Sequence, residues 1–173
     1  LRAILENYKN KINVVAINDL GSIETNAHLI KYDSTHGTIS EDVATSKDGF
    51  KIANHNIKVF SERDPENIPW NKVGADVILE CTGIFLDKIS AAKHIKGGAK
   101  KVIISAPAKD VDFTIVQGVN SNQLKKEHSI ISNGSCTTNC LAPVAMILEK
   151  NFGISYGYMT TIHSYTGDQK LLD

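Results

Sequence analysis

Two segments of the chain carry residue types that could do covalent chemistry. The first, Ser132–Ala142 (SNGSCTTNCLA), places Cys136 in a run of small and hydroxyl residues. The second, Thr160–Thr166 (TTIHSYT), contains His163. A thiol beside an imidazole is the usual arrangement for a nucleophilic cysteine. A lone histidine on a strand is more often structural, so the spacing alone leaves the Cys136–His163 pair as a hypothesis.

The residues before Cys136 predict the start of a helix. Asn133-Gly134 is a tight-turn pair, and Ser135 is a good N-cap. Cys136 would then lie in the first helical turn, where unpaired N–H groups and the helix dipole favour an anion and lower a thiol pKa. Ser135, Thr137 and Thr138 add hydroxyl and backbone N–H donors, which suit a phosphate or an oxyanion.

The remaining cysteines and histidines offer less. Metal binding by Cys136 and Cys140 would need further ligands, and there is no second cysteine pair. We expect Cys140 and Cys81 to be buried and structural. Three cysteines are few, and an odd number cannot all pair, so a scaffold built on disulfides is not indicated. This favours a location in the reducing cytoplasm. The other histidines are interpreted as structural or exposed: His28, His36, His55, His94 and His128.

Alternating strand and helix patterns must position these residues. Continuous apolar runs predict buried strands at Lys11–Asn18, Asp76–Glu80, Lys101–Ala106, Phe113–Val119, Ser129–Ser132 and Ser155–Ser164. Helical spacing is found at Leu1–Asn10, Glu24–Tyr32, Lys88–Lys96 and Ser135–Asn151. Within 43–61, strands at Phe50–Ala53 and Ile57–Phe60 with a turn near His55-Asn56 indicate a small antiparallel excursion. The alternation predicts an α/β fold with a doubly wound, mostly parallel sheet.

Three further spots follow predicted parallel strands, at the carboxyl ends where open α/β sheets bind ligands. They are Asn18-Asp19, Glu80–Gly83 and Ser105–Ala108. An acidic residue such as Asp19 can bind ribose hydroxyls and disfavours the extra phosphate of NADP, although an N-cap or turn aspartate is the more ordinary explanation of this residue taken alone. The Gly-rich dinucleotide fingerprint is absent from the chain, so a cofactor site would need that loop before Leu1.

The composition excludes few classes of protein, but it reduces the range of binding partners that we expect. The 173 residues are 42% hydrophobic and 22% charged, with 19 basic and 19 acidic residues. A net charge of zero gives no electrostatic reason to expect nucleic acid or an anionic membrane. No apolar run approaches the roughly 18 residues that span a bilayer, and Leu1–Asn10 does not resemble a signal peptide. The abrupt ends suggest a piece of something longer, although a trimmed domain is the alternative.

The sequence resembles the phosphorylating glyceraldehyde-3-phosphate dehydrogenases over essentially the whole chain. Ser135–Pro143 (SCTTNCLAP) is similar to the family's active-site signature, and Thr160–Gln169 (TTIHSYTGDQ) to its catalytic-histidine segment. Further matches in family order are Ile17–Leu20, Lys31–Gly37, Glu62–Pro65, Cys81–Gly83 and Ser105–Asp110. The resemblance implies a Rossmann-type domain over 1–135, lacking its first strand, and the start of an α+β catalytic domain over 136–173.

The resemblance also implies a reaction. Cys136 would attack D-glyceraldehyde 3-phosphate, and His163 would act as base while hydride leaves for NAD. Inorganic phosphate would release the thioester as 1,3-bisphosphoglycerate, a step of glycolysis and gluconeogenesis. The family's residues that hold phosphate correspond to Ser135, Thr137 and Thr166. Its cofactor-binding residues correspond to Asp19, Arg63, Thr82 and Ser105. By the same analogy, the full-length protein is expected to be a homotetramer.

Some features depart from the family pattern and keep alternatives open. Ile84 replaces a basic residue that is common after the Thr-Gly pair, and Gly167 stands where many members carry Asn. Much of the catalytic domain lies outside these residues, so the free chain should be inactive. The alternatives are an erythrose-4-phosphate dehydrogenase, an enzyme that uses NADP, and a non-catalytic nucleotide-binding or interaction fragment.

Overall fold

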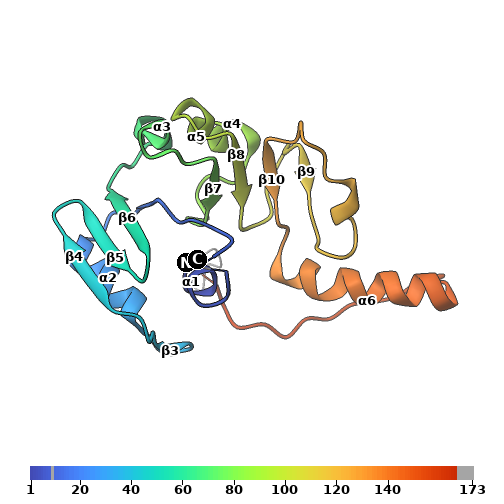
Figure 1. Ribbon diagram of the computed structural model, residues 1–173. Coiled ribbons are helices and arrows are strands. Elements are labelled where there is room, and N and C mark those ends of the chain that lie inside the picture. Colours follow the sequence, from blue (N-terminus) through green and yellow to red (C-terminus); the bar gives the residue numbers. More distant parts are fainter. Residues whose placement is uncertain (9, 167–173) are drawn as a thin grey trace, which may run out of the picture. The chain divides into compact units, whose positions relative to one another are not determined.

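The computed structural model describes residues 1–8 and 10–166, which form two compact units (Figure 1). One unit contains Leu1–Asp76 and Lys96–Ala99, and the other contains Val77–Ile95 and the chain from Lys100 onward. Each unit is built around a four-stranded sheet. Because strands alternate with helices and most sheet neighbours that follow a helix run parallel, the predicted α/β class is confirmed.

The first unit contains a mixed sheet in the order β1-β6-β5-β4. Its elements are α1 (Arg2–Asn7), β1 (Ala16–Asn18), α2 (Ile23–Lys31), β2 (Tyr32–Asp33), β3 (Gly37–Thr38), β4 (Val43–Ser46), β5 (Gly49–Ile52), β6 (His55–Phe60), a 3₁₀ turn (Pro65–Asn67) and α3 (Trp70–Val73). Strands β1 and β6 are parallel, whereas β4, β5 and β6 form an antiparallel meander. The expected antiparallel excursion is therefore confirmed, with its turn at Ala53-Asn54 rather than His55-Asn56.

The second unit contains a wholly parallel sheet in the order β7-β8-β10-β9. Its elements are β7 (Val77–Glu80), α4 (Lys88–Ala91), α5 (Lys93–Lys96, with its last residue in the other unit), β8 (Lys101–Ile104), β9 (Phe113–Thr114), a 3₁₀ turn (Ser121–Gln123), β10 (Ile130–Ser132) and α6 (Cys136–Phe152). Val102 and Ile104 of β8 are fully buried and pack with Ala91 and Ile130. Burial of such side chains, worth about 1.5–3 kcal/mol each, holds helix and sheet together.

Several predicted elements are shorter in the structure. The helix expected over Lys88–Lys96 is interrupted at Ala92, whose backbone stays right-handed (φ −62°, ψ −16°), so the chain keeps its direction through one irregular turn. Strand β1 covers three residues of the expected Lys11–Asn18, the three that pair with β6. Strand β9 ends at Thr114 because the backbone N–H of Val116 donates to the side-chain oxygen of Asn120 and not to a neighbouring strand.

The expected strand over Ser155–Ser164 is wrong for the structure described. These residues are exposed and have no strand partner within the described part of the chain. The β-branched and aromatic pattern favours an extended backbone, but a strand also needs a neighbour for its backbone hydrogen bonds. The segment is consequently an extended connection that follows α6.

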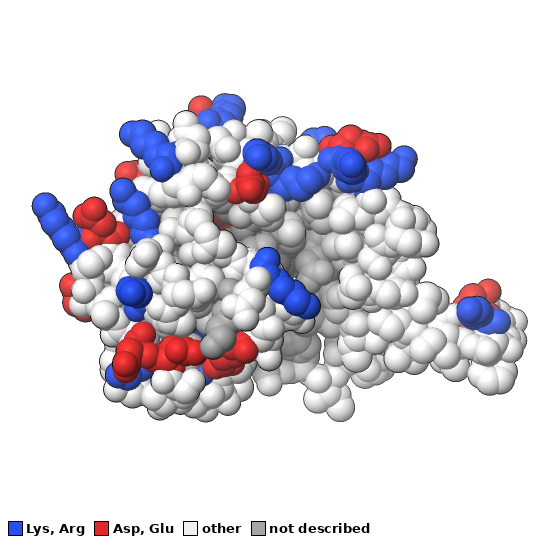
Figure 2. Space-filling model, in the orientation of Figure 1, with Lys and Arg blue, Asp and Glu red and all other residues white. Residues whose placement is uncertain are grey.

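Helix α6 is long, and the chemistry predicted from sequence lies at its first turn. It begins after the N-cap Ser135, contains Pro143, and ends before Gly153. In α6, whose residues are all described, no side chain is buried. Its only charged residues are Glu149 and Lys150 in the last turn, and Figure 2 shows the helix with almost no charged atoms until that end. Elsewhere on that face, basic side chains lie beside acidic ones.

Asp112 joins three parts of the second unit. Its carboxylate accepts hydrogen bonds from the backbone N–H groups of Ser129 and Ile130 at 2.8 and 2.9 Å, and from Lys88 Nζ at 2.5 Å. These bonds, with the Lys88 contact the largest, lower the pKa of Asp112 from 3.8 to about 2. Its stabilising contribution is therefore complete above pH 4 and is lost as the pH falls toward 2.

We expect Asp112→Asn to lower the free energy of unfolding at pH 7 by about 1–3 kcal/mol, because an amide replaces an ionised acceptor. Denaturant unfolding of wild type and variant at pH 7, 4 and 2.5 measures this. The difference should shrink as the pH falls toward 2, where the wild-type carboxylate is protonated as well. Glu127→Gln, an exposed neutralisation nearby, is the control. A difference that stays constant with pH would contradict the assignment.

Candidate active site

The second unit places three predicted site residues at one edge of its sheet. Strands β7, β8 and β10 are parallel, so Thr82, Ser105 and Ser135, which follow them, all lie at the carboxyl edge. The backbone hydrogen bonds between β7 and β8 continue one residue beyond β8, because Ser105 N–H donates to the carbonyl of Glu80 at 3.0 Å. The carboxyl edge of a parallel sheet is where α/β proteins bind ligands.

The turn that leads into α6 is fixed by side chains. Ser132 is fully buried, and its hydroxyl donates to the carbonyl of Ala106 at 2.7 Å and accepts from Gly134 N–H at 3.0 Å. Gly134 has φ +67°, a backbone conformation that favours glycine. Asn139 Nδ2 then donates to the carbonyls of Asn133 and Ser135. The predicted N-cap is confirmed, since Ser135 Oγ accepts from Thr138 N–H at 2.9 Å.

The structure brings Cys136 and His163 into contact. Cys136 Sγ lies 3.0 Å from His163 Nε2. A helix of 17 residues is about 25 Å long, and the extended residues after Gly153 are enough to return to its N-terminal end. His163 Nδ1 faces the carbonyl oxygen of Ser164, which can only accept a hydrogen bond. Nδ1 therefore carries a proton, and Nε2 is the ring nitrogen that can exchange a proton with the thiol.

This contact changes the acidity of the thiol. The hydrogen bond with His163 is the largest cause that lowers the pKa of Cys136 below its ordinary value, and the backbone N–H of Thr137 acts in the same direction. Cys136 is exposed, so reagents and substrates can reach its sulfur. A lowered pKa and an accessible sulfur are the properties of a reactive cysteine.

The other predicted site residues are divided between the two units. Thr137 belongs to the first turn of α6, and Thr166 is the last residue that the structure describes. In the first unit, Asp19 and Arg63 follow the parallel strands β1 and β6 and are exposed. Asp19 Oδ1 accepts from Gly21 N–H at 2.7 Å and from Asn26 Nδ2 at 3.3 Å. Gly167, which departs from the family pattern, lies outside the described residues.

The expectation that Cys81 and Cys140 are buried is wrong. Both are exposed free thiols. Cys140 lies on α6, none of whose fully described residues is buried, and Cys81 begins the loop after β7. Among residues 1–8 and 10–166, no group of three or more His, Cys, Asp or Glu side chains could hold a metal ion. In the same part of the chain, no helix is long and apolar enough to cross a bilayer.

The sequence patterns missed one polar contact next to the site. His94, interpreted as structural or exposed, is buried, and its Nε2 lies 2.8 Å from Oε2 of the equally buried Glu80. The two residues belong to different elements, α5 and β7, and neither stands in a motif. A carboxylate at the end of an apolar strand, Asp76–Glu80, was the available signal, because buried carboxylates almost always have a partner.

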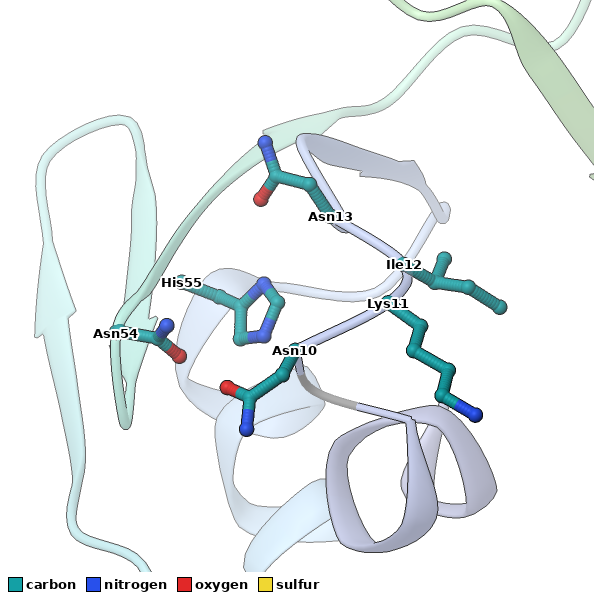
Figure 3. A pocket seen from close by; sticks show the side chains of 6 residues that line it. All are labelled: Asn10, Lys11, Ile12, Asn13, Asn54 and His55. Carbon is teal, nitrogen blue, oxygen red and sulfur yellow. The ribbon is translucent and has the colours of Figure 1, made fainter.

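The first unit has a surface hollow of its own, which contains no predicted site residue (Figure 3). The side chains that line it are Asn10, Lys11, Ile12, Asn13, Asn54 and His55. His55 Nδ1 accepts a long hydrogen bond, 3.4 Å, from Val14 N–H. Its Nε2 has no hydrogen-bond partner among the described residues. Nε2 is also closed off from solvent, so a ligand in the hollow could not reach it.

The acidity of Cys136 predicts selective alkylation. We expect iodoacetamide to label Cys136 of the full-length protein at lower pH than Cys81 and Cys140, because the thiolate is the nucleophile. All three thiols are exposed, so Cys81 and Cys140 are internal controls for access. Site-resolved mass spectrometry across pH 5–9 measures the three rates. Equal rates at every pH would show that the contact with His163 does not activate the sulfur.

Curated proteins of similar sequence align with this chain over 99–100% of its length. Residues 1–88 match the family model for the NAD binding domain of glyceraldehyde 3-phosphate dehydrogenase, and residues 135–173 match the model for its C-terminal domain. Similar curated proteins are the glyceraldehyde-3-phosphate dehydrogenases of Streptomyces coelicolor (53% identical), Xanthobacter flavus (52%) and Geobacillus stearothermophilus (53%). Each alignment covers 99–100% of this chain and 51–52% of the relative. The chain thus spans about half the length of these relatives.

Proposed function

The chain belongs to the glyceraldehyde-3-phosphate dehydrogenase family, and on that premise we propose the reaction of the longer protein that contains it. That protein oxidises D-glyceraldehyde 3-phosphate to 1,3-bisphosphoglycerate with NAD and inorganic phosphate. The observation that carries this proposal is the 3.0 Å contact between Cys136 Sγ and His163 Nε2 at the first turn of α6. A thiol with a lowered pKa can form a covalent bond with an aldehyde carbon, which a binding scaffold does not need.

Cys136 and His163 have complementary roles in this reaction. His163 Nε2 takes the thiol proton, and the thiolate of Cys136 attacks the aldehyde carbon. The resulting alkoxide takes this proton back from His163, which gives a thiohemiacetal and a neutral imidazole. NAD, when bound, supplies the hydride acceptor. As the hydride leaves the carbon, His163 holds the proton released from the thiohemiacetal hydroxyl, and a thioester remains on Cys136. Phosphate oxygen then attacks the thioester carbonyl, the C–S bond breaks, and Cys136 leaves as thiolate.

The first turn of α6 suits the phosphate that attacks. The helix dipole and the unpaired N–H groups of a helix N-terminus attract an anion. Ser135 and Thr137 flank Cys136 there and add hydroxyl donors. We assign these two residues to the attacking phosphate and Thr166 to the phosphate of the substrate.

Residues at the carboxyl ends of parallel strands suit the dinucleotide. Asp19 uses Oδ1 for two local hydrogen bonds, and Oδ2 has none among the described residues, so it can accept from a ribose hydroxyl. We assign Asp19 and Arg63 to the adenosine half of NAD. Thr82 and Ser105, exposed beyond β7 and β8, complete the cofactor-binding set.

The assignments extend to the organisation of the longer protein. We place the boundary between the dinucleotide-binding and catalytic domains at residues 135 and 136, just before α6. The Gly-rich phosphate loop would precede Leu1. The longer protein is proposed to be a homotetramer in the cytoplasm, a reducing compartment that suits three exposed free thiols.

An assay of the full-length protein tests the reaction. NADH formation should require glyceraldehyde 3-phosphate and should reach steady turnover only with inorganic phosphate. Without phosphate, one equivalent of NADH per site should form and then stop, because the thioester accumulates. Faster turnover of erythrose 4-phosphate, or preference for NADP, would replace the proposed substrate or cofactor. Tight NAD binding without any turnover would leave a nucleotide-binding scaffold.

A further inference from the structure

Glu80 is the common attachment point of two loops at the carboxyl edge of the second sheet. Its carboxylate Oε1 accepts from Thr82 N–H at 2.7 Å, and its backbone carbonyl accepts from Ser105 N–H at 3.0 Å. Thr82 and Ser105 are the two residues of this unit assigned above to the cofactor. Both loops therefore depend on where Glu80 lies.

His94 holds Glu80 in place from the side of α5. The Nε2–Oε2 distance is 2.8 Å, and the side chains of His94 and Glu80 are 5% and 3% exposed. Because a carboxylate accepts, His94 Nε2 is the donor. The ring of His94 also packs edge-on against Phe85, with centroids 6.3 Å apart. Glu80 precedes and Phe85 follows the loop Cys81–Ile84, so one imidazole contacts both ends of that loop.

Polar groups of the loop Cys81–Ile84 also form hydrogen bonds with Glu80 and within the loop. Thr82 donates its backbone N–H to the Glu80 carboxylate. Its hydroxyl oxygen accepts from Ile84 N–H at 3.1 Å, and Gly83 adopts φ +73°. Burial raises the pKa of Glu80, but the hydrogen bonds from His94 and Thr82 together outweigh it and lower the pKa. The carboxylate is ionised near neutral pH, and each of its oxygens has a donor.

We propose that the buried Glu80–His94 pair is a positioning element that fixes the Cys81–Ile84 and Ser105 loops in the conformation that binds NAD. The inference rests on the proposed function of the longer protein. Glu80 and His94 act through Thr82 and Ser105 and do not touch the reacting atoms. The N–H of Thr82 is not a cofactor donor in this arrangement, because it is occupied by Glu80.

Kinetics of variants in the full-length protein test the proposal. His94→Leu removes the donor at similar volume, and we expect KM for NAD to rise about tenfold, the equivalent of one charge-assisted hydrogen bond. The kcat at saturating NAD and KM for the aldehyde should stay within twofold. His94→Gln keeps an N–H donor and should restore KM for NAD to within threefold of wild type. Glu80→Gln, which is isosteric, should raise KM for NAD severalfold and provides a second variant if His94→Leu does not fold.

A matched control separates positioning from general loss of stability. Ile130→Val shortens a buried side chain of the same sheet, away from the loop, and should lower Tm without changing KM for NAD. If His94→Leu and Glu80→Gln also lower Tm but leave KM for NAD unchanged, the pair is structural and the proposal is overturned. Titration calorimetry of the wild type with NAD tests the premise separately. A wild type that binds no NAD would remove the proposed function as well.

Discussion

Cys136→Ser in the full-length protein should lower kcat for the oxidation of glyceraldehyde 3-phosphate by at least about 10⁴-fold, or more than about 5 kcal/mol of transition-state stabilisation. A serine hydroxyl has a far higher pKa than a thiol, so His163 cannot convert it into an anion of comparable population. The Nε2 contact at 3.0 Å would remain as an ordinary hydrogen bond. Steady-state NADH formation measures the loss.

Cys140→Ser is the matched control for that variant. Cys140 is an exposed thiol on the same helix, one turn further from the N-terminus. We expect its replacement to change kcat by less than twofold. Binding of NAD should be the same in both variants, because neither residue is among those assigned to the cofactor. Retention of more than a few per cent of kcat by Cys136→Ser would rule out the covalent route.

His163→Asn should lower kcat by about 10²–10⁴-fold, the usual contribution of a positioned general base. The hydrogen bond with His163 is the largest cause of the lowered pKa of Cys136, so this pKa should rise in the variant. At neutral pH a smaller fraction of the thiol is ionised, and the residual activity should increase as the pH is raised. Rate profiles from pH 6 to 10 distinguish this slope from a uniform loss.

Alkylation of the same variant provides an independent readout. The pH at which iodoacetamide labels Cys136 should move upward in His163→Asn, while the labelling of Cys81 and Cys140 should not change. His128→Asn is the matched control, because His128 stacks on Phe113 and does not contact the thiol. An unshifted Cys136 profile in His163→Asn would mean that the helix N-terminus alone activates the sulfur.

Local patterns predicted the parts of the site that depend on neighbours in sequence. The turn at Asn133-Gly134, the cap by Ser135 and the position of Cys136 in the first helical turn are all short-range features, and the structure has them. The contact between Cys136 and His163 was a hypothesis from spacing and resemblance, because a lone histidine says nothing about what it will meet.

The failures involve tertiary contacts. The apolar residues around Cys140 predict a buried side chain. Cys140 is exposed, because no other element packs over α6 in the described structure. The segment 155–164 has strand-forming residues but lacks a neighbouring strand there. The Glu80–His94 contact joins a strand end to a helix 14 residues later, and neither side chain belongs to a pattern that sequence reasoning can recognise.

Ser132 is a buried residue of the second unit that cannot be replaced on the basis of side-chain volume alone. By volume it is a small, fully buried side chain on a central stretch of sheet, the kind of position at which an engineer would install alanine without concern. Its hydroxyl, however, donates to the carbonyl of Ala106 and accepts from the N–H of Gly134, so it connects the loop after β8 to the turn that precedes Cys136. Alanine would fit the space but would remove both hydrogen bonds. Repacking algorithms that score only shape would accept a substitution whose damage falls on the geometry of Cys136.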